Sequence, residues 1–219
     1  MIAAWPCPGG EELALALDRG RPARLLILPA LFDEGNKLRH FTAQAMRLLG
    51  DAGIDSLLPD LPGCNESLAP LATQTLAGWR EAARAAAAHF AATHVLAIRA
   101  GALLAPALPG WRYAPQDGPA VLRTLLRARL LAGREAGRTE TSQELMATGL
   151  GKGLNLLGYS LGPQLFRELE TASLTGSSGQ SDIAPADLGG PGLWLRAEPD
   201  HDPAQAAALA ALIAGGIGA

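Results

Sequence analysis

The chain has 219 residues, of which 48% are hydrophobic and 18% are charged. This length allows one large domain with a sizeable core, and the composition excludes an intrinsically disordered chain. The net charge of −3 argues against a nucleic-acid-binding protein, which would carry a basic face.

The number of cysteines, the first ten residues and the lengths of the apolar stretches narrow the class of protein further. Cys7 and Cys64 are too few for a disulfide framework or a four-ligand zinc site, so we expect no metal and no cofactor, and a reducing compartment. Residues 1–10 lack the basic and apolar regions of a signal peptide, and no apolar stretch is long enough to span a bilayer. We therefore expect a cytoplasmic protein without a membrane span.

The first half of the chain alternates between apolar runs and segments with helical periodicity. Strands are predicted at residues 11–18, 24–29, 55–59 and 93–98. Helices are predicted at residues 36–50 and 76–90, and another begins at 100–105. This alternation predicts an α/β protein with a doubly wound, mostly parallel sheet.

The second half is more irregular. We predict strands at 111–114, 154–158 and 192–197, and helices at 119–132, 163–172 and 203–214. Thr141 and Glu144 form a capping-box pattern that predicts a helix starting there. We interpret residues 118–175 as a helical cap inserted into one domain spanning 1–219, and residues 175–191 as a flexible loop.

Polar side chains follow several of the predicted strands. Ligands of parallel sheets bind beyond the carboxyl ends of the strands, so we expect a ligand site there. The candidates are Asp33, Glu34, Asn36, Lys37, Asp60 and Arg99. The alternative for each is an ordinary solvated strand end, which is equally plausible for a single residue.

One motif suggests catalysis. The run from Gly158 to Gly162 fits the Gly-x-Ser-x-Gly nucleophile elbow, with Ser160 as nucleophile. Asp182, Asp187 and Asp200 follow it, and then His201, in the chain order of a Ser-Asp-His triad. The five-residue pattern is short, however, and Ser160 can instead cap the next helix. We favour the capping role.

The layout of the chain up to Arg99 resembles the α/β-hydrolase fold, in which the elbow follows the strand after an Asp-x-x-Gly-x-x-x-Ser loop. Arg99 then stands at the nucleophile position. Residues 28–39 are similar to the Pro-Pro-Phe-x-Glu-Glu-x-Asn-Lys-x-Arg segment of the second type of exosortase-system-associated α/β hydrolases. Residues 60–67, 96–104 and 158–161 are similar to the same family, although Ala30 replaces its second proline.

The resemblance covers roughly residues 24 to 174 and implies a link to bacterial exopolysaccharide and protein-sorting loci. It places the triad acid at Asp200 or Asp202, after the predicted strand 192–197, and leaves no room for the usual final strand and histidine. Arg99 at the elbow would attract an anion, or pair internally with a carboxylate from Asp33, Glu34 or Asp60, which we favour.

Two further residues need an explanation. Lys37, in the first turn of its helix, needs an acidic partner, and Glu34 is the nearest in sequence. Cys64 has no adjacent base and is expected to be a plain loop cysteine.

We therefore predict an α/β-hydrolase-like domain without a working triad, which binds a small anionic molecule or a partner in an exosortase or exopolysaccharide system. The alternative is an active serine esterase that uses Ser160, His201 and either Asp187 or Asp200. A third candidate is a structural partner protein whose interface is formed by residues 121–131. A homodimer is a further possible assembly of the chain.

Overall fold

The structure, a computed structural model, describes residues 1–174 and 179–218. Its centre is a seven-stranded sheet with the order β1-β2-β4-β3-β5-β6-β9. The parallel strands are β4 (Asp55–Pro59), β3 (Arg24–Leu28), β5 (His94–Ile98), β6 (Gly110–Tyr113) and β9 (Gln180–Ile183). An antiparallel hairpin of β1 (Ile2–Cys7) and β2 (Gly10–Leu17) extends the sheet beside β4.

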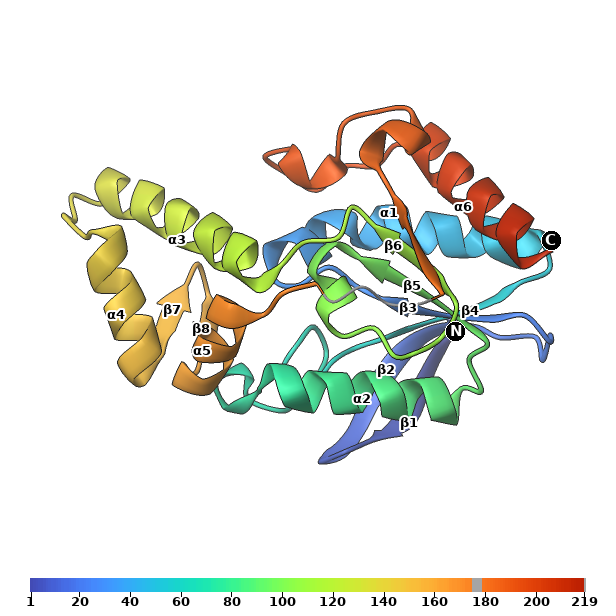
Figure 1. Cartoon of the computed structure of the whole chain (residues 1–219), viewed down its shortest axis with the longest axis horizontal. Coiled ribbons are helices and arrows are strands. Elements are labelled where there is room, and N and C mark those ends of the chain that lie inside the picture. Colours follow the sequence, from blue (N-terminus) through green and yellow to red (C-terminus); the bar gives the residue numbers. More distant parts are fainter. Residues whose placement is uncertain (175–178, 219) are drawn as a thin grey trace.

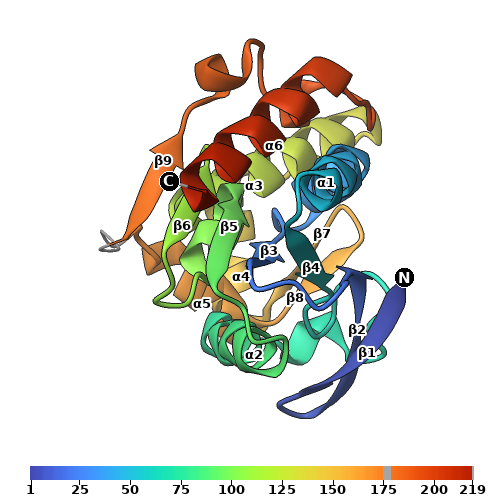
Figure 2. The ribbon, with the colours of Figure 1, turned by 90° about the vertical axis from the view of Figure 1, so that its right-hand side faces the viewer.

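Helices cover both faces of this sheet, which is why most side chains of its central strands are apolar and buried. Helices α1 (Asp33–Asp51) and α6 (Pro203–Ile217) lie on one face, and α2 (Leu76–His89) lies on the other (Figure 2). Successive side chains of β3 alternate between the two resulting cores. Leu25 and Ile27 pack in the core with α1 and α6, whereas Leu26 packs in the core with α2.

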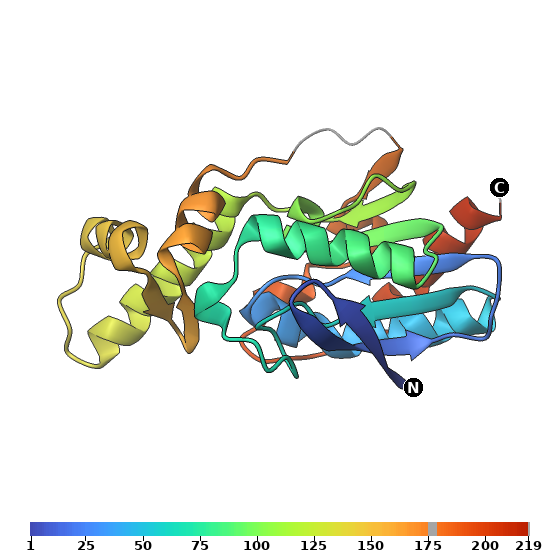
Figure 3. The ribbon, with the colours of Figure 1, turned by 90° about the horizontal axis from the view of Figure 1, so that it is seen from below.

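An insertion leaves the sheet between β6 and β9. It consists of α3 (Gly118–Glu135), α4 (Ser142–Lys152), the hairpin β7 (Leu154–Leu156) and β8 (Tyr159–Leu161), and α5 (Pro163–Thr171). Figures 1 and 3 show it, in yellow and orange, extending past the end of the sheet that lies opposite the two chain termini. Because it follows the carboxyl end of β6, it stands next to the edge where ligands of such sheets bind.

Short 3₁₀ helices connect the larger elements. They are η1 (Leu71–Thr73), η2 (Arg99–Leu103), η3 (Pro185–Leu188) and η4 (Leu193–Leu195). Two of them replace expected elements. The expected strand at 192–197 is wrong, because η4 occupies it, and η2 stands where we expected a helix to begin.

Most sequence-based expectations for the elements are confirmed. The mostly parallel doubly wound sheet is present, and Thr141 and Glu144 form the expected capping box at α4. The expected loop over 175–191 is partly wrong, because residues 180–183 form β9 and residues 185–188 form η3. Residues 175–178 of that loop lie outside the described residues.

Within residues 1–174 and 179–218, no helix combines the length and the hydropathy that crossing a membrane requires.

Candidate functional site

The turn after β5 places a guanidinium at the carboxyl edge of the sheet. Arg99 begins this turn with a φ of 54°, a left-handed conformation that is uncommon for a residue other than glycine. Two residues later, a Cβ on Gly101 would lie 2.5 Å from the carbonyl oxygen of Pro29. The turn therefore packs tightly against the loop after β3, and the side chain at its crest is that of Arg99.

Arg99 is closed off by its neighbours. Its Nε and Nη2 donate to the two carboxylate oxygens of Glu34, at 2.9 and 3.2 Å, and its Nη1 donates to the carbonyl of Ala114 at 2.8 Å. The guanidinium carbon lies 4.1 Å from the ring centroid of Trp194. The Arg99 and Glu34 side chains are only 12% and 13% exposed. The internal pairing that we favoured is therefore present, with Glu34 as the partner.

Lys37 has a different partner from the one expected. Its Nζ lies 2.9 Å from a carboxylate oxygen of Asp33, whereas Glu34 is engaged with Arg99. Residues four apart on a helix share one side, so the contact between Asp33 and Lys37 follows from helical geometry. The prediction of Glu34 as the partner of Lys37 is wrong.

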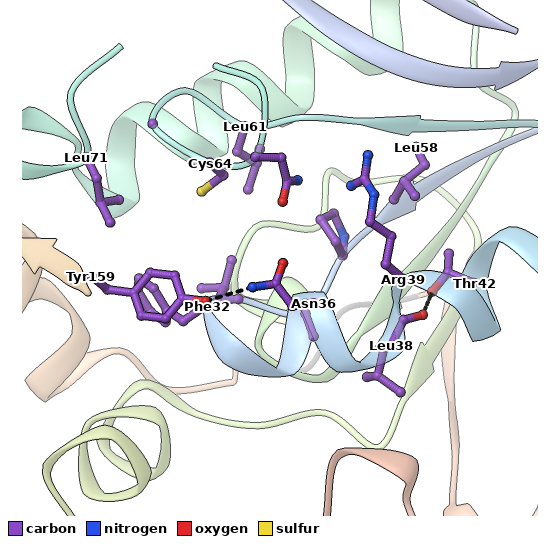
Figure 4. A pocket seen from close by; sticks show the side chains of 16 residues that line it. Phe32, Asn36, Leu38, Arg39, Thr42, Leu58, Leu61, Cys64, Leu71 and Tyr159 are labelled. Atoms are coloured by element: carbon purple, nitrogen blue, oxygen red, sulfur yellow. Dashed lines mark hydrogen bonds between the residues drawn. The ribbon is translucent and has the colours of Figure 1, made fainter. Parts of the chain in front are cut away.

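A cavity of about 180 Å³ opens beside α1 (Figure 4). It is bounded by the loop after β3, the first turns of α1, the loop after β4 and Tyr159 of the insertion. Most of the wall is apolar, formed by Pro29, Ala30, Leu31, Phe32, Leu38, Leu58, Leu61 and Leu71. The polar groups at the wall are Asn36, Arg39, Thr42, Cys64, Asn65 and Tyr159.

Tyr159 joins the insertion to α1 across the cavity. The Nδ2 of Asn36 donates to its hydroxyl at 3.0 Å, and its ring meets that of Phe32 edge-on at 5.4 Å. Burial raises the pKa of Tyr159, so its hydroxyl keeps its proton at neutral pH. Of the six ligand candidates, Asn36 is therefore the one that lines this cavity.

Asp60 lies next to the cavity in the loop after β4. It is buried and accepts a hydrogen bond from Asn65 Nδ2 at 2.7 Å. Arg39 Nη1 also approaches it, at the longer distance of 3.4 Å. Asp60 thus holds the loop and orients two lining side chains.

Cys64 lines the same cavity as a neutral thiol. Burial raises its pKa to about 12, and the charges of Asp60 and Glu12 add to the shift. Because the thiolate is the nucleophile, Cys64 is inert at neutral pH, which agrees with its expected role as a plain loop cysteine.

The Gly-x-Ser-x-Gly motif has a structural explanation. Leu157 and Gly158 form the two-residue turn of the hairpin β7–β8, both with positive φ. A side chain on Gly162 would collide with the carbonyl of Ala72. Ser160 lies on β8 opposite Asn155, whose Nδ2 donates to its hydroxyl at 2.9 Å. Both glycines thus serve the hairpin and its packing. Ser160 does not follow β5, and the expected role of Ser160 as the cap of α5 is wrong, because Gly162 occupies the N-cap position of that helix.

The residues of the alternative triad make other contacts in the structure. Asp200 accepts from Arg196 and from the backbone N–H of His201, and the His201 ring lies 4.4 Å from that of His40. Among residues 1–174 and 179–218, no hydrogen bond joins Ser160 to His201. The structure therefore gives each of the three proposed triad residues other partners.

The other acidic candidates have structural partners as well. Asp182 pairs with Arg112 at 2.6 Å, and Asp187 accepts from the backbone N–H of Ala184 at 2.7 Å. Asp202 caps α6. In the same described part of the chain, no group of three or more His, Cys, Asp or Glu residues is placed to hold a metal ion.

Comparisons with known proteins agree with this topology. The structure of alpha/beta hydrolase domain-containing protein 10 from mouse is similar, with a TM-score of 0.61, 14% sequence identity, and coverage of 100% of this chain and 98% of that one. The protein has an α/β-hydrolase fold. The structure of ferulic acid bound to Est1E from Butyrivibrio proteoclasticus is also similar, with a TM-score of 0.59, 16% identity, and coverage of 83% of this chain and 77% of that one.

These likenesses establish the fold and not an activity, because the sequence identities are low. No protein-family model matches the chain. No curated protein matches it either.

Three side chains of the candidate site and its surroundings were not singled out from the sequence. Tyr159 was noted only as part of the serine motif, although it lines the cavity. Arg39 was noted only at the end of the family segment, and its spacing from Asn36 on one helix could have indicated a shared site. The contact between Trp194 and Arg99 joins distant parts of the chain, and no local pattern signals it.

Proposed function

We propose that this α/β-hydrolase-fold protein does not hydrolyse esters and instead binds a small ligand in the cavity beside α1. The observation that carries the proposal is the closed ion pair between Arg99 and Glu34 at the turn after β5. Covalent hydrolysis needs a nucleophile that a neighbouring base can deprotonate. A guanidinium stays protonated in proteins, so Arg99 supplies neither a nucleophile nor a base.

The shape of the open space supports a ligand site in the cavity beside α1. The hollow that Arg99 and Trp194 line is larger, at about 440 Å³, but it is shallow and open to solvent. The cavity beside α1, at about 180 Å³, is more enclosed and is lined by Asn36 and Arg39. It therefore surrounds a small molecule more completely than the hollow beside Arg99 does. The insertion, which contributes Tyr159 to the wall, would act as the cap of this site.

The family resemblance supports a biological setting. The segments 28–39, 60–67 and 158–161, which resemble exosortase-system-associated proteins, all contribute residues to the cavity wall. We therefore propose that the ligand, or a protein partner that presents it, belongs to an exopolysaccharide or exosortase system. Deleting the gene and measuring extracellular polysaccharide tests this setting. Unchanged polysaccharide would contradict it.

The absence of hydrolysis is tested with purified protein and p-nitrophenyl acetate and butyrate. The wild type, Ser160→Ala and Arg99→Ala are each expected to release p-nitrophenol no faster than buffer. A wild-type rate above buffer that disappears in Ser160→Ala would overturn the proposal in favour of the serine-esterase alternative.

A further inference from the structure

We infer that the ligand of the cavity beside α1 is a small monocarboxylate with an apolar tail. The inference rests on the proposed function, because it takes the cavity as the binding site, and it adds the chemical class of the ligand. The cavity, at about 180 Å³, is smaller than the roughly 300 to 1,000 Å³ of pockets for drug-sized ligands. It therefore suits a molecule of only a few carbon atoms.

The wall selects an apolar body. Leu31, Leu58, Leu61 and Leu71, together with Phe32, are among its lining residues. Burying an alkyl group against such a wall contributes about 0.8 kcal/mol for each methylene. A sugar or another polyhydroxylated molecule would lose its hydration without finding matching partners on these side chains.

Arg39 supplies the charge at the polar side. It rises from α1 towards the loop after β4 (Figure 4), and its side chain is 43% exposed. Its approach to Asp60, at 3.4 Å, is longer than the ~2.7–2.9 Å of a strong charge-assisted hydrogen bond. Asp60 receives its shorter bond from Asn65. The guanidinium therefore keeps N–H donors for a second carboxylate, which its planar fork binds well.

Tyr159 and Asn36 add neutral donors to the cavity wall. The Tyr159 hydroxyl accepts from Asn36, so its own proton remains available to a ligand oxygen. The second N–H of the Asn36 amide is likewise not used by Tyr159. Together with Arg39, these groups form a set rich in donors, which favours a ligand head that is rich in acceptors.

The nearby carboxylates do not reverse this preference. Asp60 and Glu12 are buried, and within the described part of the chain neither is a lining residue of the cavity. Glu12 is engaged by the Ser67 hydroxyl at 2.7 Å, and Asp60 by Asn65. An amine head would instead meet the guanidinium of Arg39, and like charges repel.

The test is a matched series of probes, namely hexanoate, 1-hexanol and hexylamine, titrated into the purified protein by isothermal calorimetry. Hexanoate is expected to bind, 1-hexanol to bind about tenfold more weakly, and hexylamine not to bind. Arg39→Gln is expected to weaken hexanoate about tenfold and leave 1-hexanol unchanged, which also shows that the cavity remains folded. Arg47→Gln, an exposed arginine on the same helix that does not line this cavity, is the control and should bind like the wild type.

The outcomes separate this inference from the proposed function. Equal affinity for hexanoate and 1-hexanol, or an Arg39→Gln variant that keeps the affinity for hexanoate, overturns the carboxylate and leaves a neutral-ligand site standing. No binding by any of the three probes also overturns the inference. None of these calorimetric outcomes bears on the proposed absence of hydrolase activity, which the ester assay above tests separately.

Discussion

Replacing Glu34 with glutamine is expected to destabilise the protein more than its position on the first turn of α1 alone would cause. The substitution keeps the size of the side chain and removes the charge that faces Arg99. The guanidinium would then remain 12% exposed with the Ala114 carbonyl and the Trp194 ring as its other contacts. Breaking one side of a buried pair costs about 3 to 5 kcal/mol. Because the glutamine oxygen can still accept one hydrogen bond, we expect about 2 to 3 kcal/mol.

Asp33→Asn on the same helical turn is the matched control. It also removes one negative charge from the first turn of α1, so both variants lose the same interaction with the helix dipole. Asp33 is 51% exposed, and its one ion pair within residues 1–174 and 179–218 is with Lys37, so its loss should cost about 0.5 kcal/mol. The difference between the two variants therefore isolates the buried pair.

Urea unfolding, followed by circular dichroism, measures both free energies of unfolding. A double variant, Glu34→Leu with Arg99→Met, should recover most of the stability lost by Glu34→Gln, because removing both charges leaves none uncompensated. If Glu34→Gln and Asp33→Asn lower the free energy of unfolding equally, the ion pair at the turn is not the closed, buried interaction described above.

Three further outcomes are expected. Gly101→Ala should lower the free energy of unfolding in urea by about 2 kcal/mol, because the new Cβ would meet the Pro29 carbonyl. Gly151→Ala, where a Cβ has open space, should be neutral or slightly stabilising. Equal effects of the two substitutions would contradict the tight turn. The hydrogen bond from Arg24 lowers the pKa of Asp18 from 3.8 to about 2, so the contribution of Asp18 to stability is present above pH 3.8 and is lost as the pH falls towards 2. In urea unfolding, Asp18→Asn should therefore lose less stability than the wild type over that pH range. An unchanged pH dependence in Asp18→Asn would argue against the pairing. Because the pKa of the Cys64 thiol is about 12, iodoacetamide at pH 8 should label Cys64 slowly in the folded protein and rapidly in urea. Peptide mass spectrometry measures both rates. Rapid labelling of the folded protein would contradict the burial of Cys64.

The sheet was predictable where its strands are buried on both faces. Residues 24–28, 55–59 and 94–98 are apolar runs between turn signals, and the helices between them show regular apolar spacing. The position of Arg99 after the third of these runs followed from the same alternation. Its partner was narrowed to three carboxylates, because sequence alone does not determine which of them the turn brings within reach.

The wrong predictions of secondary structure concern segments that are buried on one side and exposed on the other. β9 has the sequence Gln-Ser-Asp-Ile and pairs only with β6, so its polar residues read as a loop. Residues 192–197 contain apolar side chains, yet Gly192 and Trp194 turn the chain there, and the Trp194 ring packs on Arg99. Long-range contacts such as that between Asn36 and Tyr159 leave no local signal, which is why the cavity was not foreseen.

The most direct test of the account is the reaction of the folded protein with a fluorophosphonate, followed by intact-mass spectrometry. Such probes attach to serines that a neighbouring base activates. Among the residues that the structure describes, the hydrogen-bond partner of Ser160 is the amide of Asn155 on β7, which is not a base. The account predicts an unchanged mass. A stoichiometric adduct at Ser160, absent from Ser160→Ala, would contradict it.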